Sequence, residues 1–213
     1  YKRQVQDHKR AYRGDTGPNT GGMGTYSDAN HSLPFLNEND ITHARMINEK
    51  TIEALQKEIG EGYKGILYGG FMATASGVKL IEYNARLGDP EAMNVLSILK
   101  TDIVDIFNSI GRGTLSELSI DFDNKATVCK YAVPEGYPDK PMKGKKIDIS
   151  SVLNKDSLFF ASVDIEGDHL IEAGSRTVAV VGIANSISQA EKIAQEEISK
   201  VGGPLFHRED IGR

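Results

Sequence analysis

Apolar residues recur at helical spacing over residues 41–59 and again over residues 188–201, so the sequence predicts an amphipathic helix in each stretch. Asp40 or Thr42 can cap the start of the first helix, and Gly60 can end it. We interpret the first helix as scaffold and the second as the cover of a small sheet.

Two shorter helices are predicted in the middle of the chain. The first begins at Pro90 with Asp89 as its cap, and its helical spacing continues to Leu99. The second begins after Asp102 and is stopped by two glycines. The character of the sequence changes beyond these glycines, which places a domain boundary near residues 111–119.

Short runs of apolar and β-branched residues predict strands around these helices. The strands are expected at residues 4–6, 63–74, 78–83, 126–133 and 178–183. Residues 75–77 would turn the chain so that the second and third of these strands pair antiparallel. Residues 157–165 and 169–173 are expected to form a further hairpin. Together these elements predict an α+β fold, with one domain over residues 1–113 and a small α+β domain over residues 114–213.

Composition and charge narrow the classes of partner. The 213 residues carry a net charge of −5, which argues against a general binder of nucleic acid or of a membrane surface. No apolar run is long enough to span a membrane. Cys129 is the single cysteine, so an intrachain disulfide is excluded and a reducing compartment, the cytoplasm, is expected. Its apolar neighbours indicate that Cys129 is a buried core residue.

A carboxylate, an amide and a guanidinium stand at alternate positions near the end of the strand over residues 78–83. Glu82 and Asn84 share one face of that strand, and Arg86 joins them if the strand runs on. Glu82 and Asn84 offer hard oxygen ligands suited to Mg²⁺. Arg86 can hold a phosphate or carboxylate through two hydrogen bonds. The pattern predicts a metal–phosphate site; a solvated strand face with an incidental Glu–Arg pair is the alternative.

Glycines crowd residues 14–26, where four of them stand within eight residues. Such a stretch is not expected inside a helix or strand, and glycine lets the backbone approach a ligand closely. Its N–H groups can form a concavity that binds an anion, with Lys9, Arg10 and Arg13 beside it. The final Gly-Lys-Ser/Thr of a P-loop is absent, and so is the frame of a dinucleotide fingerprint. A flexible polar linker is the alternative.

Several segments together resemble the glycinamide ribonucleotide synthetase family, also called the phosphoribosylamine–glycine ligases. The resemblance begins with QDHKR at residues 6–10 and DTGPNTGGMG at residues 15–24. It continues at residues 82–91, which are similar to the family's metal-binding end, and at residues 206–212, which are similar to its C-terminal segment. The DTGPNTGGMG run is highly specific, whereas the Glu-x-Asn-x-Arg spacing is shared by ATP-grasp enzymes generally.

The resemblance implies an ATP-grasp ligase of purine synthesis, here the distal half of the ATP-grasp domain followed by the C-terminal domain. ATP would phosphorylate the carboxylate of glycine, and the amine of 5-phosphoribosylamine would attack the acyl phosphate. Glu82 and Asn84 would bind Mg²⁺ or Mn²⁺, and Arg86 would be the catalytic charge clamp. The positions that would bind substrate are Asp7, Lys9, Arg10, Asp15, Thr16, Gly17, Pro18, Asn19, Thr20, Gly21 and Gly22.

Two departures from the family qualify this interpretation. A second metal carboxylate is frequent on the neighbouring strand of ATP-grasp sites, but Tyr68, Gly69 and Gly70 stand there. The family's earlier portion is missing and the chain opens without methionine, so we expect a fragment that needs that portion as its partner and cannot turn over alone. The alternatives are another ATP-grasp carboxylate–amine ligase and a noncatalytic phosphate-binding module.

Overall fold

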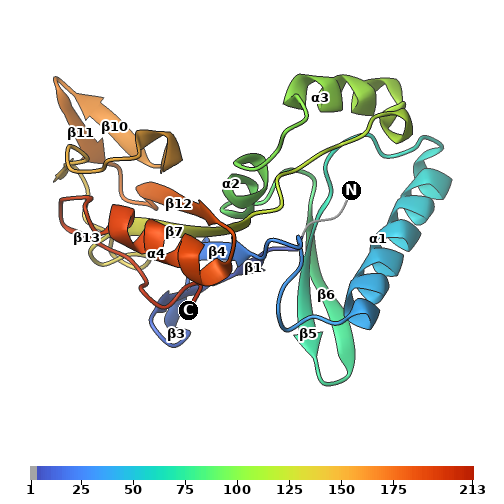
Figure 1. The fold of residues 1–213 in the computed structure, drawn as a ribbon, viewed down its shortest axis with the longest axis horizontal. Helices are drawn as coiled ribbons and strands as arrows, with labels where there is room; N and C mark the ends of the chain where they lie inside the picture. Colours follow the sequence, from blue (N-terminus) through green and yellow to red (C-terminus); the bar gives the residue numbers. More distant parts are fainter. Residues whose placement is uncertain (1–3) are drawn as a thin grey trace. The chain divides into compact units, whose positions relative to one another are not determined.

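The structure is a computed structural model that describes residues 4–213 (Figure 1). Its strands pair antiparallel and are accompanied by helices, which confirms the predicted α+β class. The chain forms two compact units that interleave along the sequence. The first unit comprises Pro34–Gly88 and Leu99–Asp123; the second comprises the described residues up to Leu33, then Asp89–Ile98 and Asn124–Arg213. The sequence boundary expected between residues 113 and 114 stays a prediction.

The long helix of the first unit is α1, Glu38–Ile59, and it begins earlier than expected. Asn37 is its N-cap, because the Asn37 side chain accepts hydrogen bonds from the backbone N–H groups of Asn39 and Asp40. Asp40 returns a bond to the backbone of Asn37 and completes a capping box. The predicted cap at Asp40 or Thr42 is therefore wrong. Gly60 ends the helix in the left-handed conformation, with φ of 81°, as predicted.

The hairpin of the first unit consists of β5, Tyr68–Thr74, and β6, Gly77–Asn84. The first strand is shorter than the predicted 63–74. The Tyr83 hydroxyl donates to Asn48 Oδ1 over 2.8 Å and also lies 3.1 Å from Thr51 Oγ1, which attaches the hairpin to α1. Ile81 is an extra residue in β6, since the neighbouring positions pair with consecutive residues of β5. This bulge changes the direction of the side chains that follow it.

The remaining helix of the first unit, α3, spans Ile103–Arg112 and starts where the sequence places it. Asp102 caps it by accepting a hydrogen bond from the N–H of Val104 over 2.8 Å. Gly113 ends it with φ of 74°. A short 3₁₀ turn, η1 at Leu115–Glu117, follows.

A six-stranded antiparallel sheet forms the core of the second unit. Its strands are β1 (Gln6–Asp7), β4 (Gly24–Ser27), β7 (Ala126–Pro134), β12 (Val178–Ala184), β9 (Leu158–Phe160) and β13 (Leu205–Phe206). The order is β1-β4-β7-β12-β9, with β13 also pairing with β7. Every residue of β7 is buried, which agrees with the apolar and β-branched residues from which this strand and β12 were predicted. Cys129 lies on β7 and is buried, as expected.

Helix α4, Ile187–Ile198, packs across β7 and β12 (Figure 1). Gly182 of β12 lies under this helix, and a Cβ atom there would overlap the carbonyl oxygen of Ala190 and lie 2.8 Å from the backbone nitrogen of Ala194. The close approach of helix to strand therefore depends on glycine at this position.

Replacing Gly182 with Ala is expected to destabilise the protein by more than about 2 kcal/mol, because helix and sheet must separate to admit the methyl group. The matched control is Gly111→Ala in α3, where a Cβ atom would meet open space. That control should gain roughly 0.5–1 kcal/mol from better helix propensity. Urea unfolding followed by circular dichroism measures both changes. Equal midpoints for the two variants would contradict the predicted packing.

Smaller elements complete the second unit. They are β2 (Arg10–Tyr12), β3 (Thr16–Asn19), α2 (Glu91–Leu96), β8 (Lys146–Ile147), η2 (Lys155–Ser157), β10 (Val163–Glu166) and β11 (His169–Glu172). The hairpin expected from residues 157–165 and 169–173 is only partly correct. Its first arm is divided between two sheets, because β9 pairs with β12 whereas β10 pairs with β11.

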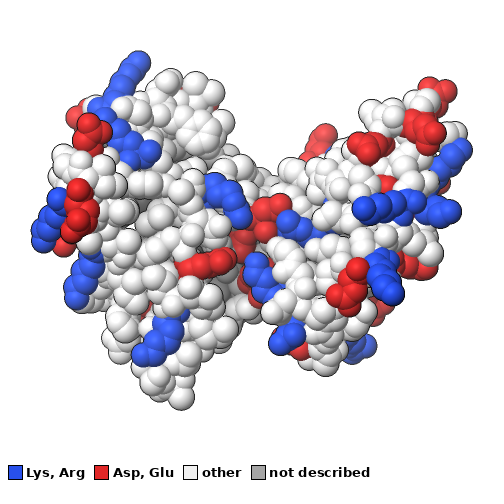
Figure 2. Space-filling view, turned by 180° about the vertical axis from the view of Figure 1, so that it is seen from behind, with Lys and Arg blue, Asp and Glu red and all other residues white. Residues whose placement is uncertain are grey.

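On the face shown in Figure 2, basic and acidic side chains are interspersed and no large patch of a single sign is visible. Within residues 4–213, no helix combines the length and apolar character needed to cross a membrane.

Candidate functional site

The predicted metal ligands lie at the end of β6. Glu82 pairs with Gly70 of β5, and Asn84 pairs with Tyr68. Glu82 and Asn84 lie on one face, since Asn84 Nδ2 donates to Glu82 Oε1 over 3.3 Å. The positions opposite both ligands therefore carry no carboxylate, as the sequence indicated.

The oxygen atoms of Glu82 and Asn84 at this strand end are of the kind that bind Mg²⁺. A carboxylate and an amide oxygen are hard ligands, and Mg²⁺ is commonly bound by one or two carboxylates with waters and substrate phosphates completing the shell. The part of the chain that the structure describes contains no group of three or more His, Cys, Asp or Glu side chains placed to hold a metal ion. The exposed Glu82 and its neighbour Asn84 offer two such oxygen ligands on one face of the strand end.

Arg86 does not continue the strand face. Arg86 was expected to share the face of Glu82 and Asn84 only if the strand continued to it. β6 ends at Asn84, so this expectation is not met. The exposed Arg86 guanidinium donates through Nη1 to the carbonyl oxygen of Leu87 over 2.8 Å. An exposed guanidinium at a strand end keeps donors available for an anion.

The glycine-rich stretch of the second unit is a β-hairpin rather than a loop. Strands β2 and β3 pair through Arg10 with Asn19 and through Tyr12 with Thr16, with a bulge between the two pairs. The expectation that this stretch excludes a strand is wrong. Thr16–Asn19 is a short, exposed edge strand that makes few backbone hydrogen bonds, and Pro is tolerated in such a position. Gly17 has φ of 82°, and the Tyr12 ring covers it so closely that a Cβ atom would overlap the ring.

Backbone N–H groups of this stretch are largely engaged within the protein. Gly22 N–H donates to Thr20 Oγ1 over 3.0 Å, and Gly21 N–H donates to the Tyr137 hydroxyl over 3.3 Å. Further bonds occupy the N–H groups of Gly14, Thr20 and Met23. The predicted anion concavity built from backbone donors is therefore not formed by these groups. Binding of a phosphate at the hairpin would fall to side chains such as Lys9 and Arg10.

Asp7 lies under the turn at Gly22. A Cβ atom on Gly22 would lie 2.9 Å from Asp7 Oδ1 and 2.8 Å from Pro90 Cδ, so glycine is required for this approach. Lys9 Nζ lies 2.7 Å from Asp7 Oδ2. Burial raises the pKa of Asp7, and the nearby Glu91 carboxylate raises it further, whereas Lys9 opposes both. Carboxyl groups whose pKa is shifted in this way are frequent at binding or catalytic positions.

Asp89, Tyr131 and Arg176 surround the same turn and were not recognised from the sequence. Arg176 Nη1 donates to the carbonyl oxygen of Gly21 over 3.0 Å, and Arg176 Nη2 donates to Asp89 Oδ2 over 2.9 Å. The Arg176 guanidinium also lies 4.8 Å from the centre of the Tyr131 ring, and the Tyr131 hydroxyl donates to Asp89 Oδ1 over 3.2 Å. The predicted cap role of Asp89 is wrong: Pro90 is the N-cap of α2 and makes no side-chain capping bond.

Asp7 is one of the substrate-binding positions that the resemblance implies. Replacing it with Asn in the full-length protein is expected to lower kcat/KM for the ligase reaction implied by the resemblance by about 100-fold, the order of effect of a misplaced or lost substrate contact. Its stability at neutral pH should not fall. The raised pKa means that the native state binds the proton more tightly than the unfolded chain, so ionisation of Asp7 costs stability as pH rises above 3.8.

Thermal unfolding from mildly acidic to neutral pH, measured beside the initial rate, tests this pair of effects. Asp139→Asn on the exposed surface is the control and should change neither quantity. A large loss of thermal stability in Asp7→Asn at neutral pH would contradict the interpretation that the ionised Asp7 side chain destabilises the folded protein.

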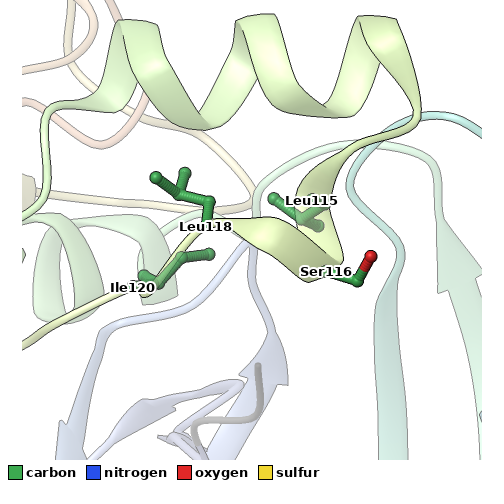
Figure 3. A pocket seen from close by; sticks show the side chains of 4 residues that line it. All are labelled: Leu115, Ser116, Leu118 and Ile120. Carbon is green, nitrogen blue, oxygen red and sulfur yellow. The ribbon is translucent and has the colours of Figure 1, made fainter.

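An apolar pocket lies in the first unit, in the segment that follows α3. It has a volume of about 320 Å³ and is lined by Leu115, Ser116, Leu118 and Ile120. Figure 3 shows Ser116 pointing away from the three aliphatic side chains. The lining includes no group that titrates or binds a metal, so we assign no chemistry to this pocket.

Comparison with known proteins identifies the family. Residues 2–92 match the family model described as the ATP-grasp (A) domain of phosphoribosylglycinamide synthetase, and residues 127–213 match the model of its C domain. The chain belongs to the phosphoribosylglycinamide synthetase family. Both matches agree with the resemblance seen in the sequence.

Named relatives of this synthetase family share about half of their residues with the chain over nearly its whole length. The phosphoribosylamine–glycine ligase of Methanosarcina barkeri is 52% identical over 208 residues, which is 98% of this chain and 48% of that protein. That of Methanocaldococcus jannaschii is 50% identical over 212 residues, with the same coverage. The chain therefore spans about half the length of the curated relatives that it matches.

Solved structures extend the comparison to the fold. The crystal structure of a phosphoribosylamine–glycine ligase from Thermotoga maritima superposes with a TM-score of 0.83 at 31% identity, over 97% of this chain and 50% of that one. The biotin carboxylase domain of the 2-oxoglutarate carboxylase of Hydrogenobacter thermophilus, solved with MgADP, gives a TM-score of 0.59 at 16% identity. It covers 94% of this chain and 42% of that one, and at this identity it shows the shared fold alone.

Proposed function

We propose that the full-length protein carrying this chain joins glycine to 5-phosphoribosylamine, with ATP converted to ADP and phosphate. The observation that carries the proposal is the set of relatives named phosphoribosylamine–glycine ligase, which are about half identical over 98% of this chain. The retained Glu82 and Asn84 pair supports a catalytic rather than a merely binding protein.

The proposed reaction would use the strand end at Glu82 and Asn84 as well as the hairpin at residues 10–19. A carboxylate is a poor electrophile until a phosphoryl group converts one of its oxygens into a leaving group. In the proposed sequence, a glycine carboxylate oxygen attacks the terminal phosphorus of ATP and ADP leaves. The amine of phosphoribosylamine then attacks the acyl carbon, phosphate leaves with the former carboxylate oxygen, and an amide forms.

In this proposal the residues of the first unit serve the nucleotide. Glu82 and Asn84 would hold Mg²⁺ or Mn²⁺, and the metal would supply charge neutralisation on the phosphates of ATP. Arg86 would stabilise negative charge on the phosphoryl group in transfer.

The residues of the second unit would serve the acceptor. We propose that the substrate surface comprises Asp7, Lys9, Arg10, Asp15, Thr16, Gly17, Pro18, Asn19, Thr20, Gly21 and Gly22. Lys9 and Arg10 are exposed cations suited to a sugar phosphate. Asp7 is a largely buried carboxyl group, with a side chain 12% exposed, and is suited to an amine. We place the reaction in the cytoplasm, because Cys129 is the single cysteine of the chain and purine synthesis uses soluble substrates.

Phosphate release from ATP by the full-length protein, with Mg²⁺, tests the proposal. Release should require both glycine and phosphoribosylamine, the latter generated in situ. Release that ignores glycine would indicate an ATP-grasp ligase with another acid substrate. Absence of release under every condition would overturn the ligase assignment in favour of a phosphate-binding module.

A further inference from the structure

Arg208 is a buried cation that contacts the glycine-rich hairpin from the far end of the sequence. Its side chain is 2% exposed. Arg208 Nη1 donates to Asp15 Oδ1 over 2.7 Å and to the carbonyl oxygen of Arg10 over 3.0 Å. One guanidinium nitrogen therefore joins strand β2 to the turn that follows it.

Asp210 completes this contact. Its carboxylate accepts two hydrogen bonds from Arg208, over 3.0 Å from Nε and 2.7 Å from Nη2. Asp210 Oδ2 also accepts the N–H of Gly14 over 2.9 Å. We call Arg208 and Asp210 the C-terminal clamp, since together they bind strand β2 at Arg10 and the following turn at Gly14 and Asp15.

The hairpin turn needs such support. Gly14 and Asp15 both adopt the left-handed conformation, with φ of 72° and 54°, and Asp15 is a residue type that tolerates this conformation only at some cost. β2 and β3 have three and four residues, and an isolated two-stranded hairpin of this size is marginal in water. Local interactions alone would leave the turn mobile.

The clamp stands on a rigid base. Strand β13 pairs Phe206 with Val133 of β7, directly before the clamp. Lys130 Nζ donates to the carbonyl oxygen of Glu209 over 2.9 Å, between the two clamp residues. Ile211, directly after the clamp, is fully buried in the core of the second unit. The hairpin turn is thus fixed to the central sheet through residues 206–211.

The charges of the clamp are strongly stabilised. Burial disfavours ionisation of Asp210, but hydrogen bonds from Arg208 and from the Gly14 N–H outweigh it and hold the pKa of Asp210 far below its usual range. Burial likewise disfavours the charged guanidinium, and bonds to Asp210 and Asp15 raise the pKa of Arg208 above its ordinary value. The clamp therefore stays fully charged throughout the physiological range of pH.

We infer that Arg208 is a positioning residue for the acceptor substrate, which acts by holding the hairpin at residues 10–19 in its binding shape through Asp15 and Asp210. The inference rests on the proposed function, because it takes this hairpin as the substrate surface. The Asp15 carboxylate would help to hold the hairpin through its ion pair with Arg208. The fork geometry of the guanidinium matters as much as its charge, since lysine offers a single point donor.

The test uses Arg208→Gln and Arg208→Lys in the full-length protein. Arg208→Gln should raise KM for phosphoribosylamine by about 10-fold to 100-fold, the size of effect expected when a binding surface is displaced. KM for ATP should change by less than about twofold, because distant and independent sites affect one another by no more than that. Arg208→Lys should fall between the wild type and Arg208→Gln. Arg213→Gln is the matched control, since Arg213 is a half-exposed neighbour whose guanidinium binds Glu191 of α4.

Amide hydrogen exchange over residues 10–19 gives a readout independent of activity. Exchange should accelerate by at least about tenfold in Arg208→Gln and stay unchanged in Arg213→Gln, because local opening becomes easier without global unfolding. An Arg208→Gln protein with unchanged exchange and unchanged KM would overturn the clamp. A wild type without ligase turnover would refute the proposed function instead, and the exchange result would still decide the clamp.

Discussion

Replacing Glu82 with Gln in the full-length protein is expected to lower the rate of phosphate release by at least about 100-fold, because an amide is a much weaker ligand for Mg²⁺ than a carboxylate. Glu82 is the carboxylate at the end of β6, paired with Gly70 and adjacent to Asn84. No carboxylate stands opposite to take over its part. Higher Mg²⁺ concentrations should restore part of the lost rate.

Glu58→Gln is the control for the Glu82 variant. Glu58 is an exposed glutamate of α1 in the same unit, and its replacement should leave the rate unchanged. Initial rates across a range of Mg²⁺ concentrations separate weaker metal binding from slower chemistry. A Glu82→Gln protein with the wild-type rate would show that the metal is held elsewhere.

Replacing Lys130 with Met is expected to destabilise the protein by about 3 kcal/mol, since breaking a buried ion pair leaves its other partners without their donor. Lys130 is fully buried on β7. Its Nζ donates to Glu191 Oε1 over 2.8 Å, to Gln195 Oε1 over 2.7 Å and to the carbonyl oxygen of Glu209 over 2.9 Å. This one group connects the sheet, α4 and the C-terminal segment.

The urea midpoint measures this loss, with Lys192→Met on the exposed face of α4 as control. The dependence on pH gives a second readout. Burial lowers the pKa of Lys130 although Glu191 opposes the shift, so the unfolded chain binds the proton more tightly. Wild-type stability should therefore rise as pH approaches 10.5, and the variant should lose this rise. A variant as stable as the wild type would contradict the structural role of Lys130.

The main strands and helices were predictable because each carries its own local signal. Residues 126–133 and 178–183 are rich in apolar and β-branched residues, and the structure places them as the buried centre of the sheet. Asp102 and Gly113 bound α3 through capping chemistry that depends only on neighbouring residues. Local rules suffice where the partners of a residue lie within one turn of the chain.

The failures arise where distant residues decide the outcome. The stretch at residues 16–19 has the composition of a loop, yet it forms a strand because β2 pairs with it. Asp89 has the sequence context of a helix cap, but Arg176 and Tyr131 bind its carboxylate. Those partners lie 87 and 42 residues away. No spacing rule connects residues so far apart.

The candidate site shows the same division. Glu82 and Asn84 were found from the period of a single strand, and the structure confirms that they share a face. Arg208 lies in a segment recognised only by family resemblance, and its contact with Asp15 spans 193 residues. Supporting residues of a site are therefore harder to predict than candidate ligands on one strand, since their function depends on the fold that brings them there.

Isotope transfer in the full-length protein tests the central claim most directly. Glycine labelled with ¹⁸O in its carboxylate is incubated with ATP, Mg²⁺ and phosphoribosylamine, and the released phosphate is analysed by mass spectrometry. Because the acyl phosphate retains a carboxylate oxygen on phosphorus when the amine attacks carbon, the account predicts ¹⁸O in the phosphate. Phosphate free of the label, released alongside glycinamide ribonucleotide, would contradict it.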